Sequence, residues 1–248
     1  MKAEERRTQK KYDMLAEHYH NFRTKENPQG WFYNEMLEMP TTLSVLGNVK
    51  GKKILDFGCG SGIYARLLTK KGAKLKGFDI SPEMLKIAKQ LNPKLDLRLG
   101  SGNKIPFKEK FDIVLASLVV HYLKDWNKMF KQVKRVLKKG GYFIFSTGNP
   151  MTEVREKIKI GKKKIYTFGD YFTERKINSS WEVKGKKVKM PFFHLTYETI
   201  IKTIIKNGFE IVDYKDCYPI KKAKKIFPED YATAIKRPSF NVWKVKLK

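Results

Sequence analysis

The stretch Ile54-Leu55-Asp56-Phe57-Gly58-Cys59-Gly60-Ser61-Gly62 decides the fold of this 248-residue chain. An apolar run that ends in an acid and continues into a Gly-x-Gly-x-Gly turn is typical of a β-strand that leads into a cofactor site. Glycine has no Cβ and tolerates positive φ, so such a turn lets a ligand pack directly against the backbone. A dinucleotide site requires a third glycine three positions after the second, where this chain has Ile63. The spacing therefore disfavours a nicotinamide or flavin enzyme.

A second acid follows this turn at the distance typical of a ribose ligand. The run Lys74-Leu75-Lys76-Gly77-Phe78-Asp79 is predicted to be a short strand that ends in that acid, about 20 residues after the turn. A carboxylate placed there accepts hydrogen bonds from ribose hydroxyls in doubly wound folds, so Asp79 is the predicted ribose ligand. Ser81 and Pro82 then predict a helix start, with Ser81 as the N-cap and Pro82 at the first helical position.

Five motifs occur along the chain in a fixed order: LDFGCGSG (55–62), GFDISPEML (77–85), IPF (105–107), FDIVLASLVVHYLKD (111–125) and RVLKKGGYFIFS (135–146). Together they resemble the class I S-adenosylmethionine-dependent methyltransferases, type 11-like, particularly the branch that modifies small molecules. The resemblance covers residues 50 to about 150. It implies a Rossmann-like α/β fold with a seven-stranded, mostly parallel sheet, an antiparallel last strand and helices on both faces. It also implies that S-adenosyl-L-methionine lies across the C-terminal ends of the first strands.

The hydrophobic pattern between these motifs alternates strands and helices, as expected for parallel pairing. Strands are predicted over 52–57, 74–79, 95–99, 111–117 and 142–146, and helices over 63–71, 126–137 and 196–207. Residues 209–214 and 240–247 are predicted to close the sheet as a hairpin-like pair.

Two segments outside this alternation are expected to cover the site. Residues 1–50 are predicted to form an N-terminal helical lid, and residues 51–248 the S-adenosylmethionine-binding methyltransferase domain. Tyr12 and Tyr19 share one helix face because they are seven residues apart. That face could simply dock on the sheet, but the resemblance favours Tyr19, and less strongly Tyr12, near the amino-acid end of the cofactor. Trp31 follows a Pro/Gly-rich breaker (27–30) and either packs on the core or shapes the substrate mouth.

The second covering segment is an insertion after the fifth strand, residues 149–193, predicted to contain short strands. It leaves the C-terminal edge of the sheet, where ligands bind in open α/β folds, so it is positioned to cap the site. Its aromatic residues would then line an apolar pocket; they are Tyr166, Phe168, Tyr171, Phe172 and Trp181. The alternative is a small surface subdomain that these aromatics only hold together.

The adenine position departs from the family pattern. Many relatives carry Gly-Asp-Ala before the (Leu/Ile)-Pro-Phe segment, with the aspartate accepting a hydrogen bond from the adenine amino group, whereas this chain has Gly100-Ser101-Gly102. The Ser101 hydroxyl can accept that bond without charge assistance and should contribute less. The backbone of Gly102 can still meet the ring. A cofactor-binding module that has lost its activity is the non-enzymatic alternative.

Methyl transfer from a sulfonium is an in-line displacement, so positioning dominates and a general base matters only for a protonated acceptor. His121, just past the fourth strand, is the candidate catalytic base. No pairing of histidines and cysteines predicts a metal site. The predicted substrate-binding residues are Tyr12, Trp31, Tyr122, Tyr171 and His194. The predicted cofactor-binding residues are Tyr19, Asp56, Gly58, Cys59, Gly60, Gly62, Asp79, Ile80, Met84, Ser101, Gly102 and Ser117.

The net charge of +28 makes nucleic acid a possible partner, so an RNA methyltransferase acting on tRNA or rRNA is the second hypothesis. The charge is spread along the chain, and only nine of the 53 basic residues are arginine, the side chain that suits phosphate and base recognition best. A small-molecule acceptor, methylated at O, N or C, is therefore favoured. Two separated cysteines and the lack of an apolar leader or membrane span predict a cytoplasmic protein.

Overall fold

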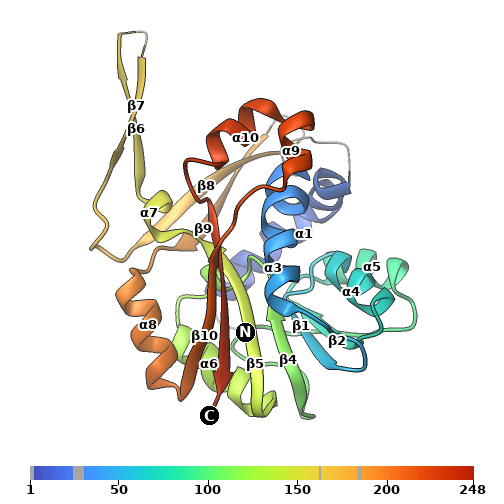
Figure 1. Ribbon diagram of the computed structural model, residues 1–248. Coiled ribbons are helices and arrows are strands. Elements are labelled where there is room, and N and C mark those ends of the chain that lie inside the picture. The colour runs from blue at the N-terminus through green and yellow to red at the C-terminus, as the bar shows by residue number, and fades with distance from the viewer. Residues whose placement is uncertain (1–2, 25–30, 162, 184–185) are drawn as a thin grey trace.

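A seven-stranded sheet forms the centre of the protein in the computed structural model, which describes residues 3–24, 31–161, 163–183 and 186–248 (Figure 1). The spatial order is β10-β11-β5-β4-β1-β2-β3. The strands are β1 (Lys53–Phe57), β2 (Lys74–Asp79), β3 (Asp96–Leu99), β4 (Phe111–Ala116), β5 (Leu137–Gly148), β10 (Phe209–Asp216) and β11 (Phe240–Leu247). Strands β1 to β5 pair in parallel, and β11 runs antiparallel to both β5 and β10. The predicted mostly parallel sheet with an antiparallel last strand is confirmed.

The strand that departs most from the sequence prediction is β5. β5 starts at Leu137, where the sequence indicates the end of a helix and a Gly-Gly turn. Phe111 pairs with Leu137 and Ile113 with Tyr142, so the register shifts between these pairs. The extra residues, including Gly140 at φ +72°, form an irregularity that lets the strand begin directly after the helix.

Helices cover both faces of the sheet (Figure 1). On one face lie α3 (Met39–Leu46), α4 (Ile63–Lys70) and α5 (Pro82–Leu91), and on the other lie α6 (Trp126–Val136) and α8 (Tyr197–Lys206). Successive strand residues point to opposite faces, so Ile54 packs in the core on the α3–α4 side and Leu55 in the core on the α6–α8 side. Burial on both faces explains the continuous apolar runs that mark these strands in the sequence.

The start of α5 is defined by the predicted N-cap. The Ser81 hydroxyl accepts a hydrogen bond from the backbone N–H of Met84, and Pro82 occupies the first helical position. The cap lies directly after Asp79 at the end of β2, so the helix begins at the C-terminal edge of the sheet. This edge is where a parallel sheet offers its ligand crevice.

The N-terminal segment lies over that edge. It consists of α1 (Ala3–Thr24), a π-helical turn η1 (Phe32–Glu38) and α3, and the breaker at 27–30 lies outside the described residues. Two hydrogen bonds tie α1 down on the α5 side, since Asp13 Oδ1 accepts from Ser81 Oγ at 2.5 Å and Glu5 Oε1 accepts from Asn103 Nδ2 at 2.8 Å. On its other side, Lys11 donates to the backbone carbonyl of Lys189.

The insertion after β5 contains short strands, as predicted. Helix α7 (Pro150–Glu153) is followed by the hairpin β6 (Arg155–Ile160) and β7 (Lys163–Phe168), and then by the hairpin β8 (Lys176–Val183) and β9 (Lys186–Phe193). The first hairpin stands clear of the rest of the chain, whereas β9 packs against α1 and the short 3-10 turn η2 (Val120–Tyr122) (Figure 1). Helices α9 (Lys221–Ile226) and α10 (Pro228–Ala234) lie between β10 and β11 in the chain.

Removing the tie at Asp13 should loosen α1. We expect Asp13→Ala to speed hydrogen exchange of the α1 amides about tenfold, because Ser81 and the amide of Glu83 lose a charged acceptor. The measurement is amide exchange followed by mass spectrometry. The matched control is Glu17→Ala, which removes an exposed carboxylate from the same helix and should leave the exchange rate unchanged. Equal rates in both variants would contradict this account of the docking of α1.

Candidate functional site

A cavity of about 610 Å³ lies at the C-terminal edge of the sheet, beneath α1. The turn after β1, the end of β2, the β3–β4 loop and the turn after β4 line its walls, and α1 supplies its cover. Among the predicted residues, those that line it are Tyr12, Tyr19, Gly58, Gly60, Asp79, Ile80, Met84, Ser101, Gly102, Ser117 and Tyr122. A volume of this size falls in the range of about 300–1,000 Å³ that cofactors and small ligands occupy.

The glycine turn after β1 forms the floor. The N–H groups of Gly58 and Cys59 both donate to the carbonyl of Phe78 at 2.9 Å, which ties the turn to the end of β2. Gly58 has φ +72°, and a Cβ at this position would come within 2.6 Å of Val119 Cγ2. Only glycine therefore fits between the turn and the neighbouring chain, and the backbone itself is left to face the cavity.

Asp79 joins this turn to the start of α5. Its Oδ2 accepts the N–H of Gly60 at 2.8 Å, and its Oδ1 accepts the N–H of Ser81 at 2.9 Å. Burial raises the pKa of Asp79, while the N–H groups of Ser81 and Gly60 oppose the rise. Each carboxylate oxygen still has a free lone pair, so the group can also accept from hydroxyl groups of a ligand.

A buried cation and a buried carboxylate lie next to residues that line the cavity, since Asp56 precedes Phe57 and Arg23 acts on Tyr19. Asp56 is 2% exposed, and its Oδ2 has no hydrogen-bond partner among the described residues. Burial raises the pKa of Asp56 to about 7, with a smaller contribution from Asp79, and Arg23 opposes the rise. Arg23, from α1, donates through Nη2 to Glu35 at 2.9 Å, while its Nε is buried and also lacks a partner among the described residues. A buried donor and a buried acceptor that both lack a partner are unusual in a folded protein.

Arg23 is not among the residues predicted from the sequence. The helical spacing could have indicated its position, because Arg23 follows Tyr19 by four residues and therefore lies on the same helix face. The charge of Arg23 also acts on the pKa of Tyr19, which burial raises overall.

The cavity lining itself also has unpaired polar atoms. Asn103 Oδ1 and Trp126 Nε1 are buried without a hydrogen-bond partner among the described residues, and both residues line the cavity. Ser101 forms a tight turn in which its carbonyl accepts from the N–H of Lys104 at 2.9 Å. A Cβ on Gly102 would come within 2.6 Å of both the Phe57 ring and the Leu123 side chain, so a glycine is required here as well.

Three predicted cofactor residues lie just outside the cavity lining. Asp56 is the first, below the floor. Cys59 is buried against Gly77 in the core beside α5, and burial raises the pKa of its thiol. Gly62, in the left-handed conformation, is the N-cap of α4 and packs against Asn92.

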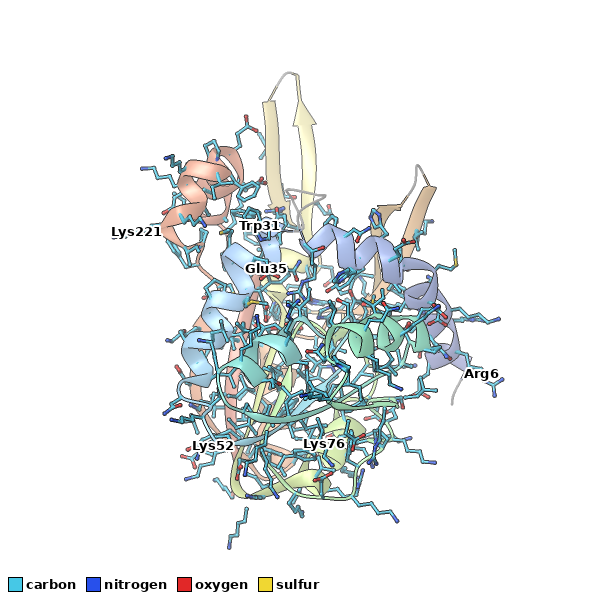
Figure 2. The ribbon with its side chains drawn as sticks, turned by 90° about the vertical axis from the view of Figure 1, so that its right-hand side faces the viewer. Arg6, Trp31, Glu35, Lys52, Lys76 and Lys221 are labelled. Carbon is cyan, nitrogen blue, oxygen red and sulfur yellow. The ribbon has the colours of Figure 1, made fainter. Side chains whose placement is uncertain are left out.

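Three predicted substrate residues lie elsewhere. Trp31 packs edge-to-face on Phe227, with ring centroids 5.9 Å apart, beside α9 and α10 (Figure 2). His194 is fully buried, with Nδ1 3.0 Å from Glu153 Oε2 and Nε2 2.9 Å from the Tyr171 carbonyl. Both partners are acceptors, which suits a protonated imidazole and raises the pKa of His194 despite its burial. The Tyr171 hydroxyl accepts from the N–H of Tyr197. Tyr171 and His194 therefore connect parts of the insertion with each other and with the start of α8.

Two other aromatics of the insertion do not line the expected pocket. Phe168 and Phe172 are 66% and 86% exposed. The side chains of Tyr166 and Trp181 lie outside the described part of the chain. The apolar packing near the cavity instead comes from β9, where Met190 contacts the α1 residue Leu15 together with Tyr12 and Tyr122.

His121 lies behind the cavity wall. Its ring packs on Tyr122 at a centroid distance of 4.2 Å and on Phe192 at 6.2 Å, and its Nδ1 is 3.4 Å from Thr147 Oγ1. Burial lowers the pKa of His121 to about 4, so the imidazole is neutral near pH 7. A neutral imidazole can accept a proton, although a low pKa makes it a weaker base than an exposed histidine.

Comparison with known proteins gives three concordant results. Residues 55–145 match the methyltransferase domain family. An uncharacterized protein of Haemophilus influenzae is 33% identical over 196 residues, which cover 72% of this chain and 75% of that protein. A crystal structure of an S-adenosylmethionine-dependent methyltransferase from Mesorhizobium loti superposes with a TM-score of 0.74 and 26% identity, over 84% of this chain and 97% of the other.

Relatives with assigned reactions match over a shorter span. The demethylmenaquinone methyltransferase of Chlorobaculum parvum is 38% identical over 109 residues, which are 43% of this chain and 45% of that enzyme. The matched segment therefore covers less than half of an enzyme whose name states its acceptor.

Proposed function

The chain belongs to the class I S-adenosylmethionine-dependent methyltransferases, and we propose that it methylates a small molecule at an oxygen, nitrogen or carbon nucleophile. The observation that carries this proposal is the enclosure of the cavity by α1, which is tied down at Asp13 and Glu5 on one side and at Lys11 on the other. A small acceptor can be sequestered under such a cover, and excluding water favours a displacement that depends on alignment.

The residues of the cavity fit S-adenosyl-L-methionine. Asp79 is the proposed ribose ligand. We assign the amino-acid end to the part of the cavity nearest Arg23 and Asp56, because the unpaired Arg23 Nε and Asp56 Oδ2 behind the lining complement its carboxylate and its ammonium. The unpaired acceptor of Asn103 and donor of Trp126 suit the edge of an adenine base, which presents an amino donor and ring-nitrogen acceptors. Asn103 could thus supply the acceptor that Ser101 replaces in this chain. When bound, the cofactor supplies a methyl group activated by a positively charged sulfur.

The RNA hypothesis has weaker support. Among the labelled basic residues, Lys52 and Lys76 lie at the lower end, Arg6 at the right and Lys221 at the upper left, which fits a dispersed charge better than a single groove (Figure 2). The residues that line the cavity include several acids, namely Glu4, Glu5, Asp125 and Glu174. Negative charge at this position repels a phosphate backbone. A small molecule avoids that repulsion.

His121 is the proposed base for acceptors that arrive protonated. Its burial keeps it neutral and able to accept a proton near pH 7. Tyr122 separates it from the cavity, so the acceptor must reach the side of Tyr122 that faces His121. Acceptors that carry a free lone pair at neutral pH need no such base.

The function is tested by turnover with a metabolite panel. Purified protein is incubated with S-adenosyl-L-methionine and each metabolite, and release of S-adenosylhomocysteine is measured, with tRNA and rRNA as parallel arms. We expect release with a small molecule and none with RNA. Methyl incorporation into RNA with a steep salt dependence would replace this proposal with the RNA hypothesis.

Asp79→Ala should weaken cofactor binding by about 30- to 100-fold, because a charged acceptor is lost from the ribose and the Gly60 turn loses its tie. Isothermal titration with S-adenosyl-L-methionine measures the dissociation constant. Asp112→Ala is the matched control, since that carboxylate accepts from the N–H of Lys53 and from Lys138 but does not line the cavity. An unchanged dissociation constant in Asp79→Ala would place the ribose elsewhere.

Cofactor affinity should rise about fivefold from pH 6 to pH 7. The pKa of Asp56 is about 7, so the ionised fraction of its carboxylate grows from about a tenth to about a half, while the cofactor ammonium stays mostly protonated. His121, with a pKa of about 4, does not titrate here. Titration calorimetry at several pH values measures the effect, and Asp56→Asn should flatten it. A pH-independent affinity in the wild type would show that Asp56 does not contact the ammonium.

His121→Phe should lower turnover of a protonated acceptor by about 100-fold and leave cofactor affinity within about threefold. Phenylalanine retains the ring contacts to Tyr122 and Phe192 and removes only the proton acceptor. Steady-state kinetics with the acceptor from the panel, together with calorimetry, separates the two effects. Wild-type turnover in this variant would exclude His121 as the base.

A further inference from the structure

The buried carboxylate of Glu38 has no part in the roles assigned above. Glu38 is the last residue of the π-helical turn η1, and its side chain is 0% exposed. Turns of this kind are rare and frequently occur at functional sites. A carboxylate away from water is costly unless it is paired or hydrogen-bonded, so its partners indicate why it is there.

Four hydroxyl groups converge on this carboxylate. Two come from the helices next to η1: Thr42 Oγ1 donates to Oε1 at 2.8 Å, and Tyr64 OH donates to Oε2 at 2.9 Å. The other two come from the sheet: Ser117 Oγ, just after β4, and Ser146 Oγ, on β5, donate to Oε1 at 3.0 and 2.6 Å. Glu38 therefore links the N-terminal segment to the ends of two central strands.

Ser146 extends this link to the backbone after β4. Its Oγ donates to Glu38 and accepts the N–H of Leu118 at 2.9 Å. Leu118 has φ +49° and is the only non-glycine residue with positive φ in the described ranges. A leucine side chain disfavours this left-handed conformation, which persists only where the surroundings hold it. Here the hydrogen bond from Leu118 to Ser146 provides that hold.

The turn that is held in this way faces the cavity. Ser117, Leu118 and Val119 all line it, and Val119 is the side chain that fits against Gly58. The same stretch continues into η2, which carries His121 and Tyr122. The turn thus lies between the glycine turn of the cofactor site and the side from which we propose that the acceptor approaches.

We propose that Glu38 is a positioning residue which, through Ser117 and Ser146, holds the Ser117–Leu118 turn in the shape that receives the methyl-bearing part of the cofactor. The inference rests on the proposed function, because the turn affects binding of the methyl group only if the cofactor occupies this cavity. A carboxylate that served stability alone would hold the N-terminal segment and leave the turn unaffected. The two roles therefore differ in whether loss of the carboxylate loosens the backbone at Leu118.

The test compares Glu38→Gln and Ser146→Ala with Thr42→Val and Tyr64→Phe. The last two variants remove donors from the same carboxylate without touching the turn. One readout is hydrogen exchange at the Leu118 amide, measured by NMR on the full chain without ligand. The other is calorimetry with S-adenosyl-L-methionine and S-adenosylhomocysteine, which differ only in the methyl group and the charge it places on sulfur.

In the first pair of variants we expect exchange at Leu118 to increase about tenfold and the ratio of the two dissociation constants to shift about fivefold. In the control pair the melting temperature should fall while both readouts stay within about twofold of the wild type. Adding Leu118→Gly to Glu38→Gln should return the ratio toward the wild-type value, because glycine adopts positive φ without hindrance. Ser146→Ala decides the matter if Glu38→Gln does not fold.

Leu118 exchange and affinity ratios that change no more in Glu38→Gln and Ser146→Ala than in the controls would overturn the proposal. A wild-type protein that binds neither ligand would instead refute the proposed function. The exchange measurement needs no ligand and would still show whether Glu38 holds the turn.

Discussion

The cavity that we propose as the cofactor site depends on the two backbone hydrogen bonds that Asp79 accepts. One comes from Gly60 in the turn after β1 and the other from Ser81 at the start of α5, so a single carboxylate fixes both walls of the crevice. Because this carboxylate is buried, its N–H partners help to offset the cost of keeping it charged. The left-handed glycines of the turn then leave bare backbone facing the ligand.

The N-terminal segment completes the site by placing charge where the sheet cannot. Arg23 on α1 lies within electrostatic range of Asp56, and Glu38 on η1 collects hydroxyl groups from the ends of β4 and β5. Both charges are buried, and both sit on a segment that precedes the first strand. When the N-terminal segment docks, it therefore covers the cavity and also brings these buried charges next to it. For this reason, docking of α1 should affect ligand binding as well as the access of ligands to the cavity.

The large positive charge of the chain says little about this site. Basic side chains lie at separate places on the molecule, as Arg6, Lys52 and Lys221 show (Figure 2). Five of the residues that line the cavity are acids, namely Glu4, Glu5, Asp79, Asp125 and Glu174. In the part of the chain that the structure describes, no helix has the length and apolar character needed to cross a membrane. The site differs from the rest of the surface in its acidic and buried charged side chains, and the net charge of the chain does not reflect this difference.

Local sequence patterns were enough to predict the strand and glycine turn at 53–62, the acid at Asp79 and the cap at Ser81, because each follows from the geometry of a few consecutive residues. The early start of β5 was not predicted, because a Gly-Gly pair usually indicates a turn. Here the pair lies within the strand, where the register against β4 shifts. Only the tertiary structure decided that Trp31 and His194 pack away from the cavity and that Arg23, Glu38 and Trp126 surround or line it. These roles come from contacts between residues far apart in the chain, and a burial pattern along one helix or strand does not specify which distant partner a side chain meets.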